Sequence, residues 1–254
     1  MLIAVIKVGI KSVELIVLVD NHPHPEAKYR TGWGLSIYIV ADETKILFDT
    51  GPNSSLLKEN AEKMDIDISK IDFCIISHMH MDHLGGIEYV ANKARNISLY
   101  LPANSYHKTQ FDELGFKTTI IPNFQWLKEG IALSGIFRER IPEQALLLNI
   151  DDFGALIIVG CSHPGIAYMA DRAGNYSGIK IGGIIGGWHL GGYSPREILS
   201  IVKSLMKYKP RFLIPIHCSG ERVREIMRSK YSEIFIDGYV GMRLRIVGSE
   251  ITYE

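Results

Sequence analysis

Short apolar runs separated by polar turns predict a chain rich in β-strands. Ile37–Val40 and Lys45–Phe48 flank a polar turn and predict a first hairpin. Leu146–Ile150 and Ala155–Val159 flank another polar turn and predict a second hairpin. Both hairpins end in small and polar residues, so the pattern divides the chain into two similar halves.

Each half also contains an apolar strand that runs into a histidine. Phe73–Ile76 precedes His78, and Phe212–Ile216 precedes His217. Amphipathic helices are expected between the strands. The clearest begins at the Ser194–Glu197 capping box, where Pro occupies the first helical position. Three more are expected, one from a cap at Ser54 or Ser55 through Met64, and the others over Leu84–Val90 and Glu221–Lys230.

Hairpins and helices that alternate in duplicated halves predict an α/β protein of the α+β type. We expect one domain over residues 1–254, a four-layer αββα sandwich in which two mixed sheets pack face to face with helices outside. The strand ends of both halves should meet at one edge. The apolar stretch Met1–Val19 carries Lys7, Lys11 and Glu14, which predicts two strands and not a membrane span.

Composition and charge limit the cellular location and the kinds of binding partner that we expect for this protein. The chain has 46% apolar and 22% charged residues, with 28 basic and 28 acidic side chains. Zero formal charge argues against nucleic acid or an anionic membrane as partner. Cys74, Cys161 and Cys218 show no disulfide spacing, which favours a cytoplasmic location.

The strongest chemical signal is His78-x-His80-x-Asp82-His83, directly after an apolar strand. His78 and His80 are two residues apart on extended chain, so both can face one ion. Asp82 and His83 fall where the chain turns into a helix, and can face a second ion. Imidazole and carboxylate ligands suit Zn²⁺, and also Fe or Mn. The sequence therefore predicts one or two metal ions per chain.

Further ligands must come from elsewhere, and three histidines follow apolar strands in Gly- or Cys-flanked settings: His163, His189 and His217. We predict that one ion is held by His78, His80 and His163, and the other by Asp82, His83 and His217. His189 is predicted to line the substrate pocket as a donor or proton carrier, and Asp82 and His189 are the predicted catalytic residues.

Other residues are expected around these ligands. Asp49 could orient a ligand imidazole or brace the histidine loop, with a simple turn-forming role as the alternative. Cys161 is expected beside the ligands, where it could also be a thiolate ligand or bridge, or an inert buried residue. The segment Asn21–Trp33 is predicted to cover the site as a mobile lid. Trp33 could stack on a planar substrate ring or pack on the core, and Arg138 could bind a substrate phosphate.

Motifs spread over essentially the whole chain resemble those of the metallo-β-lactamase superfamily. They are the Asp49-Thr50-Gly51 turn, His78-x-His80-x-Asp82-His83, and His217 after a helix and a strand. Segments 160–166, 186–190 and 216–220 are similar to the dihydropteroate-synthase-like branch. This resemblance implies the αββα metallo-β-lactamase fold and an enzyme that joins a pterin methyl diphosphate to an arylamine phosphate.

Two departures from the superfamily pattern bear on the second ion. The isolated histidine of the superfamily's third motif has no obvious counterpart between Leu84 and Gly160, and Cys161 or Ser162 replaces the expected bridging aspartate. The prediction is therefore a metal-dependent enzyme acting on a small phosphorylated or heterocyclic substrate. The alternatives are a phosphodiesterase-like hydrolase and a non-catalytic metal- or ligand-binding protein.

Overall fold

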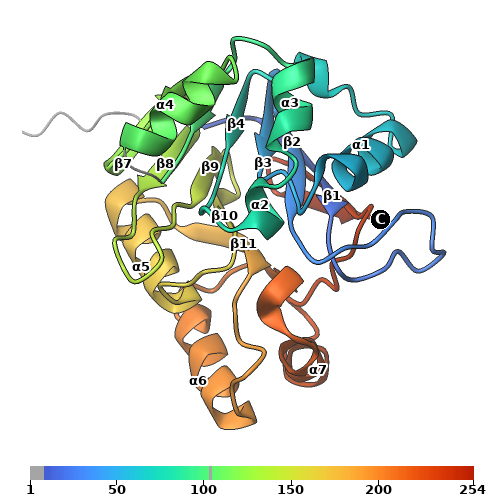
Figure 1. Cartoon of the computed structure of the whole chain (residues 1–254). Coiled ribbons are helices and arrows are strands. Elements are labelled where there is room, and N and C mark those ends of the chain that lie inside the picture. Colours follow the sequence, from blue (N-terminus) through green and yellow to red (C-terminus); the bar gives the residue numbers. More distant parts are fainter. Residues whose placement is uncertain (1–8, 103–104) are drawn as a thin grey trace, which may run out of the picture.

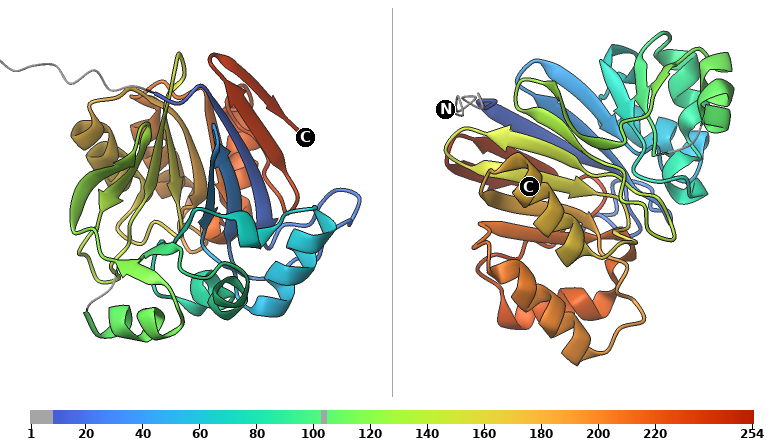
Figure 2. Two further views of the ribbon diagram at one scale, coloured as in Figure 1. Left: turned by 90° about the horizontal axis from the view of Figure 1, so that it is seen from above. Right: turned by 90° about the vertical axis from the view of Figure 1, so that its left-hand side faces the viewer.

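Two β-sheets pack face to face and helices cover their outer faces, as predicted (Figure 1). The computed structural model describes residues 9–102 and 105–254. Figure 2 shows the two sheets edge-on, with the helices of the first half on one side and those of the second half on the other. This is the αββα sandwich expected from the sequence.

The first sheet is built mainly from the N-terminal half and has the order β14-β13-β1-β2-β3-β4-β5-β6. Its predicted hairpin is β2–β3, and β3, β4, β5 and β6 are parallel to one another. Its strands are β1 (Ser12–Val19), β2 (Ser36–Ala41), β3 (Thr44–Phe48), β4 (Phe73–Ile75), β5 (Ser98–Tyr100), β6 (Lys117–Thr119), β13 (Arg243–Val247) and β14 (Glu250–Tyr253).

The second sheet has the order β12-β11-β10-β9-β8-β7. Its predicted hairpin is β9–β10, and β10, β11 and β12 are parallel. Its strands are β7 (Asn123–Lys128), β8 (Ile131–Gly135), β9 (Leu146–Ile150), β10 (Gly154–Val159), β11 (Ile181–Gly187) and β12 (Phe212–Ile216).

The helices divide between the outer faces of the two sheets (Figure 1). The first sheet carries α1 (Ser54–Lys63), α2 (Met81–Leu84), α3 (Ile87–Lys93) and α4 (Ser105–Glu113). The second carries α5 (Ile166–Ser177), α6 (Pro195–Met206) and α7 (Glu221–Lys230). The capping box that begins α6 and the bounds of α7 are as predicted.

Two details of the predicted helices are wrong. Helix α1 is capped by Asn53, whose side chain accepts from the Leu56 N–H at 2.9 Å, and not by Ser54 or Ser55. The expected helix over Leu84–Val90 is interrupted at Gly85 and Gly86. A side chain at Gly86 would clash with the Thr50 carbonyl, so the glycine allows the histidine loop to pack against the end of β3.

The predicted N-terminal strand pair is described only in part. Strand β1 covers Ser12–Val19, and residues 1–8 lie outside the described part of the chain. None of the helices in residues 9–102 and 105–254 is both long and apolar enough to cross a membrane.

The largest hydrophobic core fills the space between the sheets. Leu15 and Phe48 of the first sheet and Leu156 and Ile214 of the second are fully buried in it. Two further cores lie between each sheet and its helices. The inner parallel strands of both sheets pack against these cores, and the loops after their carboxyl ends meet at one edge, where His83 contacts His217. Any side chain that follows these strands is therefore positioned by packed structure.

Candidate metal centre

The loop after β4 brings His78 and His80 together, as the sequence predicts. Nε2 of His78 lies 3.2 Å from Nδ1 of His80. The ring of His163, which follows β10 in the other half, lies with its centroid 4.8 Å from that of His78 and 4.9 Å from that of His80. The three histidines predicted to share one ion thus converge from both sheets.

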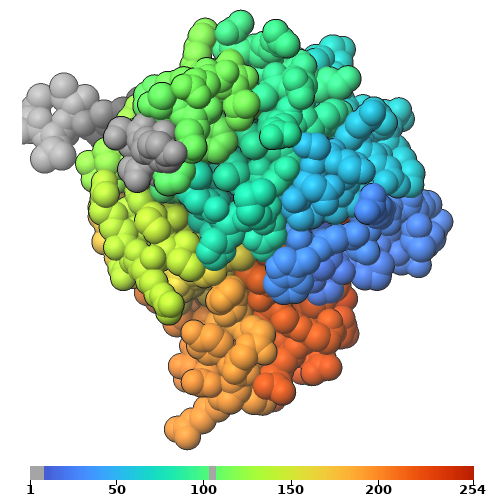
Figure 3. Space-filling view, viewed as in Figure 1, coloured from blue at the N-terminus to red at the C-terminus, as the bar shows by residue number. Residues whose placement is uncertain are grey.

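The second predicted set also converges. Oδ2 of Asp82 lies 3.3 Å from Nε2 of His217 and 3.7 Å from Nε2 of His83. The rings of His83 and His217 have centroids 4.9 Å apart. His217 opens the short 3₁₀ turn His217–Ser219 directly after β12. In Figure 3 the blue and teal segments of the first half border the yellow, orange and red segments of the second half.

Cys161 lies between the two sets. Its Sγ atom is 3.2 Å from Nε2 of His83. The ligand atoms of Asp82, His83, Cys161 and His217 all lie within 4.8 Å of one another, and so do those of His78, Cys161 and His163. Cys161 Sγ therefore stands among atoms that could hold a metal ion.

A third group joins Cys161 to His189 and Cys218, with ligand atoms again within 4.8 Å of one another. The His189 ring is exposed, and its centroid lies 4.5 Å from that of His163. A hydrogen bond with Cys218 raises the pKa of His189. Cys218 was not predicted as a site residue, although its position directly after His217 is a signal that could have identified it.

Two buried nitrogens in this cluster lack a well-formed hydrogen bond within the described residues: Nε2 of His163, and Nε2 of His217, which faces the Asp82 carboxylate at 3.3 Å. A polar atom without a good partner in a protein interior is costly, and a metal ion in each of the two predicted sets would satisfy these nitrogens. Burial and the neighbouring histidines lower the pKa of His163 to about 4, so its imidazole is neutral at pH 7. Neutral imidazole is the form that binds metal, and the residues present therefore fit a divalent ion.

The carboxylate of Asp82 is ionised as a ligand must be. Burial opposes its ionisation, but His217 and His83 beside it lower its pKa to about 2. The cluster thus combines imidazoles, a carboxylate and a thiol, which is a ligand set typical of Zn²⁺.

Asp49 occupies the orienting position that was one of its two predicted roles. It is fully buried, and its carboxylate accepts from the Ser77 N–H and the Ser77 hydroxyl, both at 2.7 Å. The same carboxylate lies 2.7 Å from Nδ1 of His83, which leaves Nε2 of that ring facing Cys161. A carboxylate behind a ligand histidine fixes its tautomer and its direction.

Glu143 supports the other half of the centre and was not predicted. It is fully buried before β9, and its carboxylate accepts from the N–H groups of Cys161, Ser162 and His163 at 3.0, 2.8 and 2.7 Å. Burial raises its pKa to about 7, against the opposing effect of these amides. No motif surrounds Glu143, so no local signal in the sequence marks it.

Asp20 supports the third loop in the same way. Its fully buried carboxylate accepts from the His217 N–H at 2.9 Å and from the His22 N–H at 2.7 Å. Oδ1 of the neighbouring Asn21 lies 3.1 Å from Nδ1 of His217. Three buried carboxylates, one behind each of the loops that carry His78, His163 and His217, therefore support the candidate centre.

The two predicted substrate residues lie in different places. Trp33, at the end of the predicted lid segment, is 61% exposed, and its ring centroid lies 5.1 Å from that of His217. Trp33 therefore lies beside the candidate metal centre and is not packed in the hydrophobic core. Arg138 lines a separate cavity, none of whose lining residues belongs to the histidine cluster.

Comparisons with known proteins agree with this geometry. The family profile of the metallo-β-lactamase superfamily matches residues 30–159, just over half of the chain. The chain is 23% identical to the 7,8-dihydropterin-6-methyl-4-(β-D-ribofuranosyl)-aminobenzene-5′-phosphate synthase of Methanocaldococcus jannaschii, over 89% of this chain and 94% of that protein. It is 29% identical to an uncharacterized protein of the same organism, over 91% of this chain and 98% of that one.

Among solved structures, a metal-dependent hydrolase of the β-lactamase superfamily has the same fold. It superposes with a TM-score of 0.76 at 22% identity, over 92% of this chain and 99% of that one. The chain belongs to the metallo-β-lactamase superfamily and is similar, within it, to a pterin-related synthase.

Proposed function

We propose that this protein is a metal-dependent enzyme that acts on a small phosphorylated substrate. The observation that carries the proposal is the convergence of imidazole nitrogens, a carboxylate and a thiol at the strand ends of both sheets. Membership of the superfamily implies divalent metal binding. We assign one ion to His78, His80 and His163 and the other to Asp82, His83 and His217, with Cys161 between them.

Two adjacent divalent ions, when bound, stabilise charge on phosphate oxygens and on a departing phosphate or diphosphate. The side chains of the protein orient the substrate and move protons. His189 is exposed beside His163, where its imidazole can exchange a proton with the reacting groups. Trp33 offers the exposed face of an indole over His217, on which a planar heterocycle can stack.

The similarity to the archaeal synthase favours a condensation as the reaction. An arylamine nitrogen would form a bond to the methylene carbon of a pterin methyl diphosphate, while the bond from that carbon to the diphosphate oxygen breaks. The amine proton must then leave, and His189 is the neighbouring base in our assignment. The test is product formation from a pterin methyl diphosphate and an arylamine phosphate, with metal-depleted protein as control.

A phosphodiesterase-like hydrolase is the alternative function, because the same ligand set serves a reaction in which water replaces the amine. The two functions separate in a panel of substrates. Turnover of generic phosphodiesters and diphosphates, with no effect of the pterin compound, would establish the hydrolase and contradict the condensation. Saturation with metal and no turnover of any substrate would contradict both.

Replacement of His80 by alanine should remove at least one metal equivalent per chain. Its ring faces His78 and His163, and loss of one ligand from a site of three strongly lowers affinity. Elemental analysis after reconstitution checks this result. Replacement of His107, which was not predicted as a ligand, is the matched histidine control. A fully metallated His80→Ala protein would contradict the ligand assignment.

Replacement of His189 by alanine should leave the metal content unchanged and lower kcat by about 100-fold or more, the usual contribution of a general acid or base. Metal content and kcat are measured on the same preparation. Loss of an ion from His189→Ala would instead place His189 among the ligands, with Cys161 and Cys218.

Fluorescence of Trp33 should change when a pterin diphosphate binds, and should change much less with a phosphodiester that lacks a planar ring. The chain has three tryptophans, so the difference between the native protein and Trp33→Phe isolates the signal of Trp33. An identical response in Trp33→Phe would show that the pterin ring does not stack on this side chain.

A further inference from the structure

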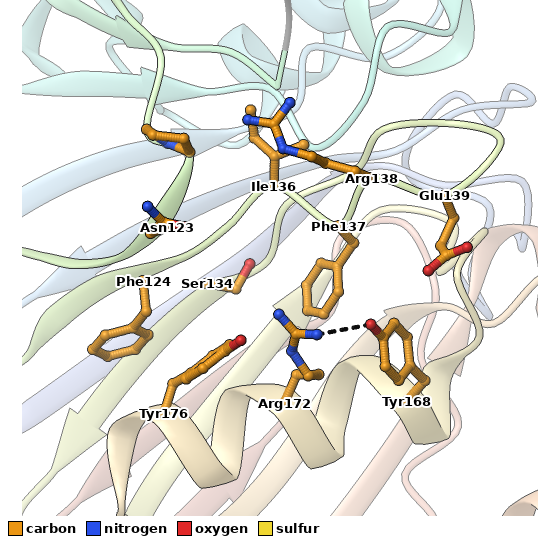
Figure 4. Close-up of a pocket in the computed structure, with 11 residues that line it drawn as sticks. Asn123, Phe124, Ser134, Ile136, Phe137, Arg138, Glu139, Tyr168, Arg172 and Tyr176 are labelled. Carbon is orange, nitrogen blue, oxygen red and sulfur yellow. Dashed lines mark hydrogen bonds between the residues drawn. The ribbon is translucent and has the colours of Figure 1, made fainter.

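A cavity with a volume of about 530 Å³ lies between helix α5 and the strands β7 and β8, apart from the metal centre (Figure 4). It is lined by residues of these elements and of the segment after β8, and by none of the residues of the metal centre. Its volume falls in the range of small-molecule binding sites, about 300–1,000 Å³. Nothing in the proposed metal chemistry uses it.

Tyr168, Arg172 and Tyr176 form one wall of this cavity. They are four residues apart on α5 and therefore project from one face of the helix, as Figure 4 shows. The guanidinium carbon of Arg172 lies 4.8 Å from the ring centroid of Tyr176 and 5.6 Å from that of Tyr168. Nη1 of Arg172 donates to the Tyr168 hydroxyl at 2.9 Å, which fixes the direction of the guanidinium.

The facing wall supplies two more rings. The centroid of Phe137 lies 6.0 Å from the Arg172 guanidinium carbon, and that of Phe124 lies 6.3 Å from the Tyr176 ring. The Phe124 and Tyr176 rings are inclined by only 35°, so they present similarly oriented aromatic faces. Aromatic walls of this kind bind flat, apolar ligand surfaces.

Arg172 is a partly desolvated cation without a counter-ion. Its Nε atom is buried and lacks a hydrogen-bond partner, and no carboxylate in the described part of the chain forms an ion pair with it. Arg138 lines the same cavity opposite α5, also without an ion pair in residues 9–102 and 105–254. Glu139 is the acidic residue of the lining, which leaves the cavity with one excess positive charge from these three side chains.

We propose that this cavity binds a small aromatic anion, that is, an arene or heterocycle that carries a phosphate or a carboxylate group. The free guanidinium nitrogens supply donors in the geometry that suits these anions. The four rings line the cavity and offer apolar surface to the aromatic part, and stacking on them does not need a particular ring substituent. A neutral arene would leave Arg172 unpaired, and inorganic phosphate would leave the aromatic walls exposed to water.

Two of the residues that line the cavity are connected to the loops around the metal centre. Tyr168 follows His163 by five residues, in the first turn of α5. The backbone N–H of Phe137 donates to the Glu143 carbonyl, and the carboxylate of Glu143 holds the His163 loop. Binding in the cavity nevertheless requires no metal, so this inference does not rest on the proposed function.

Calorimetric titration of metal-depleted protein with phenyl phosphate tests the proposal. We expect one binding site per chain, with affinity at least tenfold higher than for inorganic phosphate or for phenol. Titration with benzoate shows whether a carboxylate is accepted in place of the phosphate. Equal affinity for phenyl phosphate and inorganic phosphate, or no saturable binding, would overturn the proposal, and so would binding that appears only after metal is restored.

Two variants locate the ligand. Arg172→Met removes the charge but keeps an apolar side chain, and Tyr176→Leu keeps the charge but removes one ring. Each should lower the affinity for phenyl phosphate at least tenfold. Arg211 is the matched control, because its guanidinium also stacks on a ring, that of Phe153 at 5.5 Å, but lies outside this cavity. Unchanged affinity in both variants, or an equal loss in Arg211→Met, would show that the ligand binds elsewhere.

Discussion

Replacement of Cys161 by serine should remove at least one and up to two metal equivalents per chain and abolish most of the activity. Its Sγ atom lies within 4.8 Å of ligand atoms from both predicted ion sites. Loss of the thiol should therefore weaken binding at both sites. A serine hydroxyl has nearly the same size but remains protonated at neutral pH, and binds Zn²⁺ far more weakly than a thiolate. We expect the affinity for the more weakly held ion to fall by at least about 100-fold.

Metal content, turnover and the spectrum of the Co²⁺-substituted protein measure this effect. A thiolate ligand gives a charge-transfer band with Co²⁺ that Cys161→Ser should lack. Cys74 is the matched control, since it is also a buried free thiol but lies on β4 within the hydrophobic core. A Cys161→Ser protein that keeps both equivalents and its turnover would show that the thiol is no ligand.

Replacement of Glu143 by alanine should lower the free energy of unfolding of the metal-depleted protein by about 3 kcal/mol or more. The substitution leaves three buried N–H groups without an acceptor, and each such group costs about 1–3 kcal/mol. Glu143→Gln keeps one acceptor oxygen and should lose less. Chemical denaturation of the metal-depleted proteins provides the measurement, so that loss of bound ions does not enter.

Glu129 supplies the control for this prediction, because it is an exposed glutamate in the turn between β7 and β8. Glu129→Ala should change the unfolding free energy by less than about 0.5 kcal/mol. If Glu143→Ala were as stable as Glu129→Ala, the amides of the Cys161–His163 loop would need no carboxylate, and the positioning role of Glu143 would be wrong.

The sequence predicts the fold and most of the ligand cluster for one physical reason. Apolar strands end within a few residues before His78, His163 and His217, and parallel strands in packed sheets bring such ends to one edge. The close spacing of His78, His80, Asp82 and His83 adds a local signal that does not depend on the fold. Adjacent residues on one loop remain neighbours whatever the tertiary structure.

The supporting carboxylates could not be predicted in the same way. Glu143 is separated from Cys161 by 18 positions and Asp20 from His217 by 197, and both act through backbone amides, which every residue possesses. The role of Cys161 also depends on distance, because Sγ reaches His83 from 78 positions away. His189 and His217 both adopt positive φ angles, 51° and 52°, a strained conformation that the sequence does not reveal.

Arg138 illustrates a different limit of sequence reasoning. Its charge suggested a phosphate-binding role, but its location depends on the path of the segment after β8. The structure places it in the aromatic cavity beside α5, away from the histidine cluster. The type of side chain thus indicates which group Arg138 can bind, but it does not indicate where in the fold Arg138 lies.

Metal stoichiometry tests the central claim most directly. The protein is depleted with a chelator, reconstituted with excess Zn²⁺, passed through a desalting column and analysed for metal and protein. Our assignment predicts two equivalents per chain, one at His78, His80 and His163 and the other at Asp82, His83 and His217. A chain that retains one equivalent or none under saturating Zn²⁺ would contradict the two-ion centre.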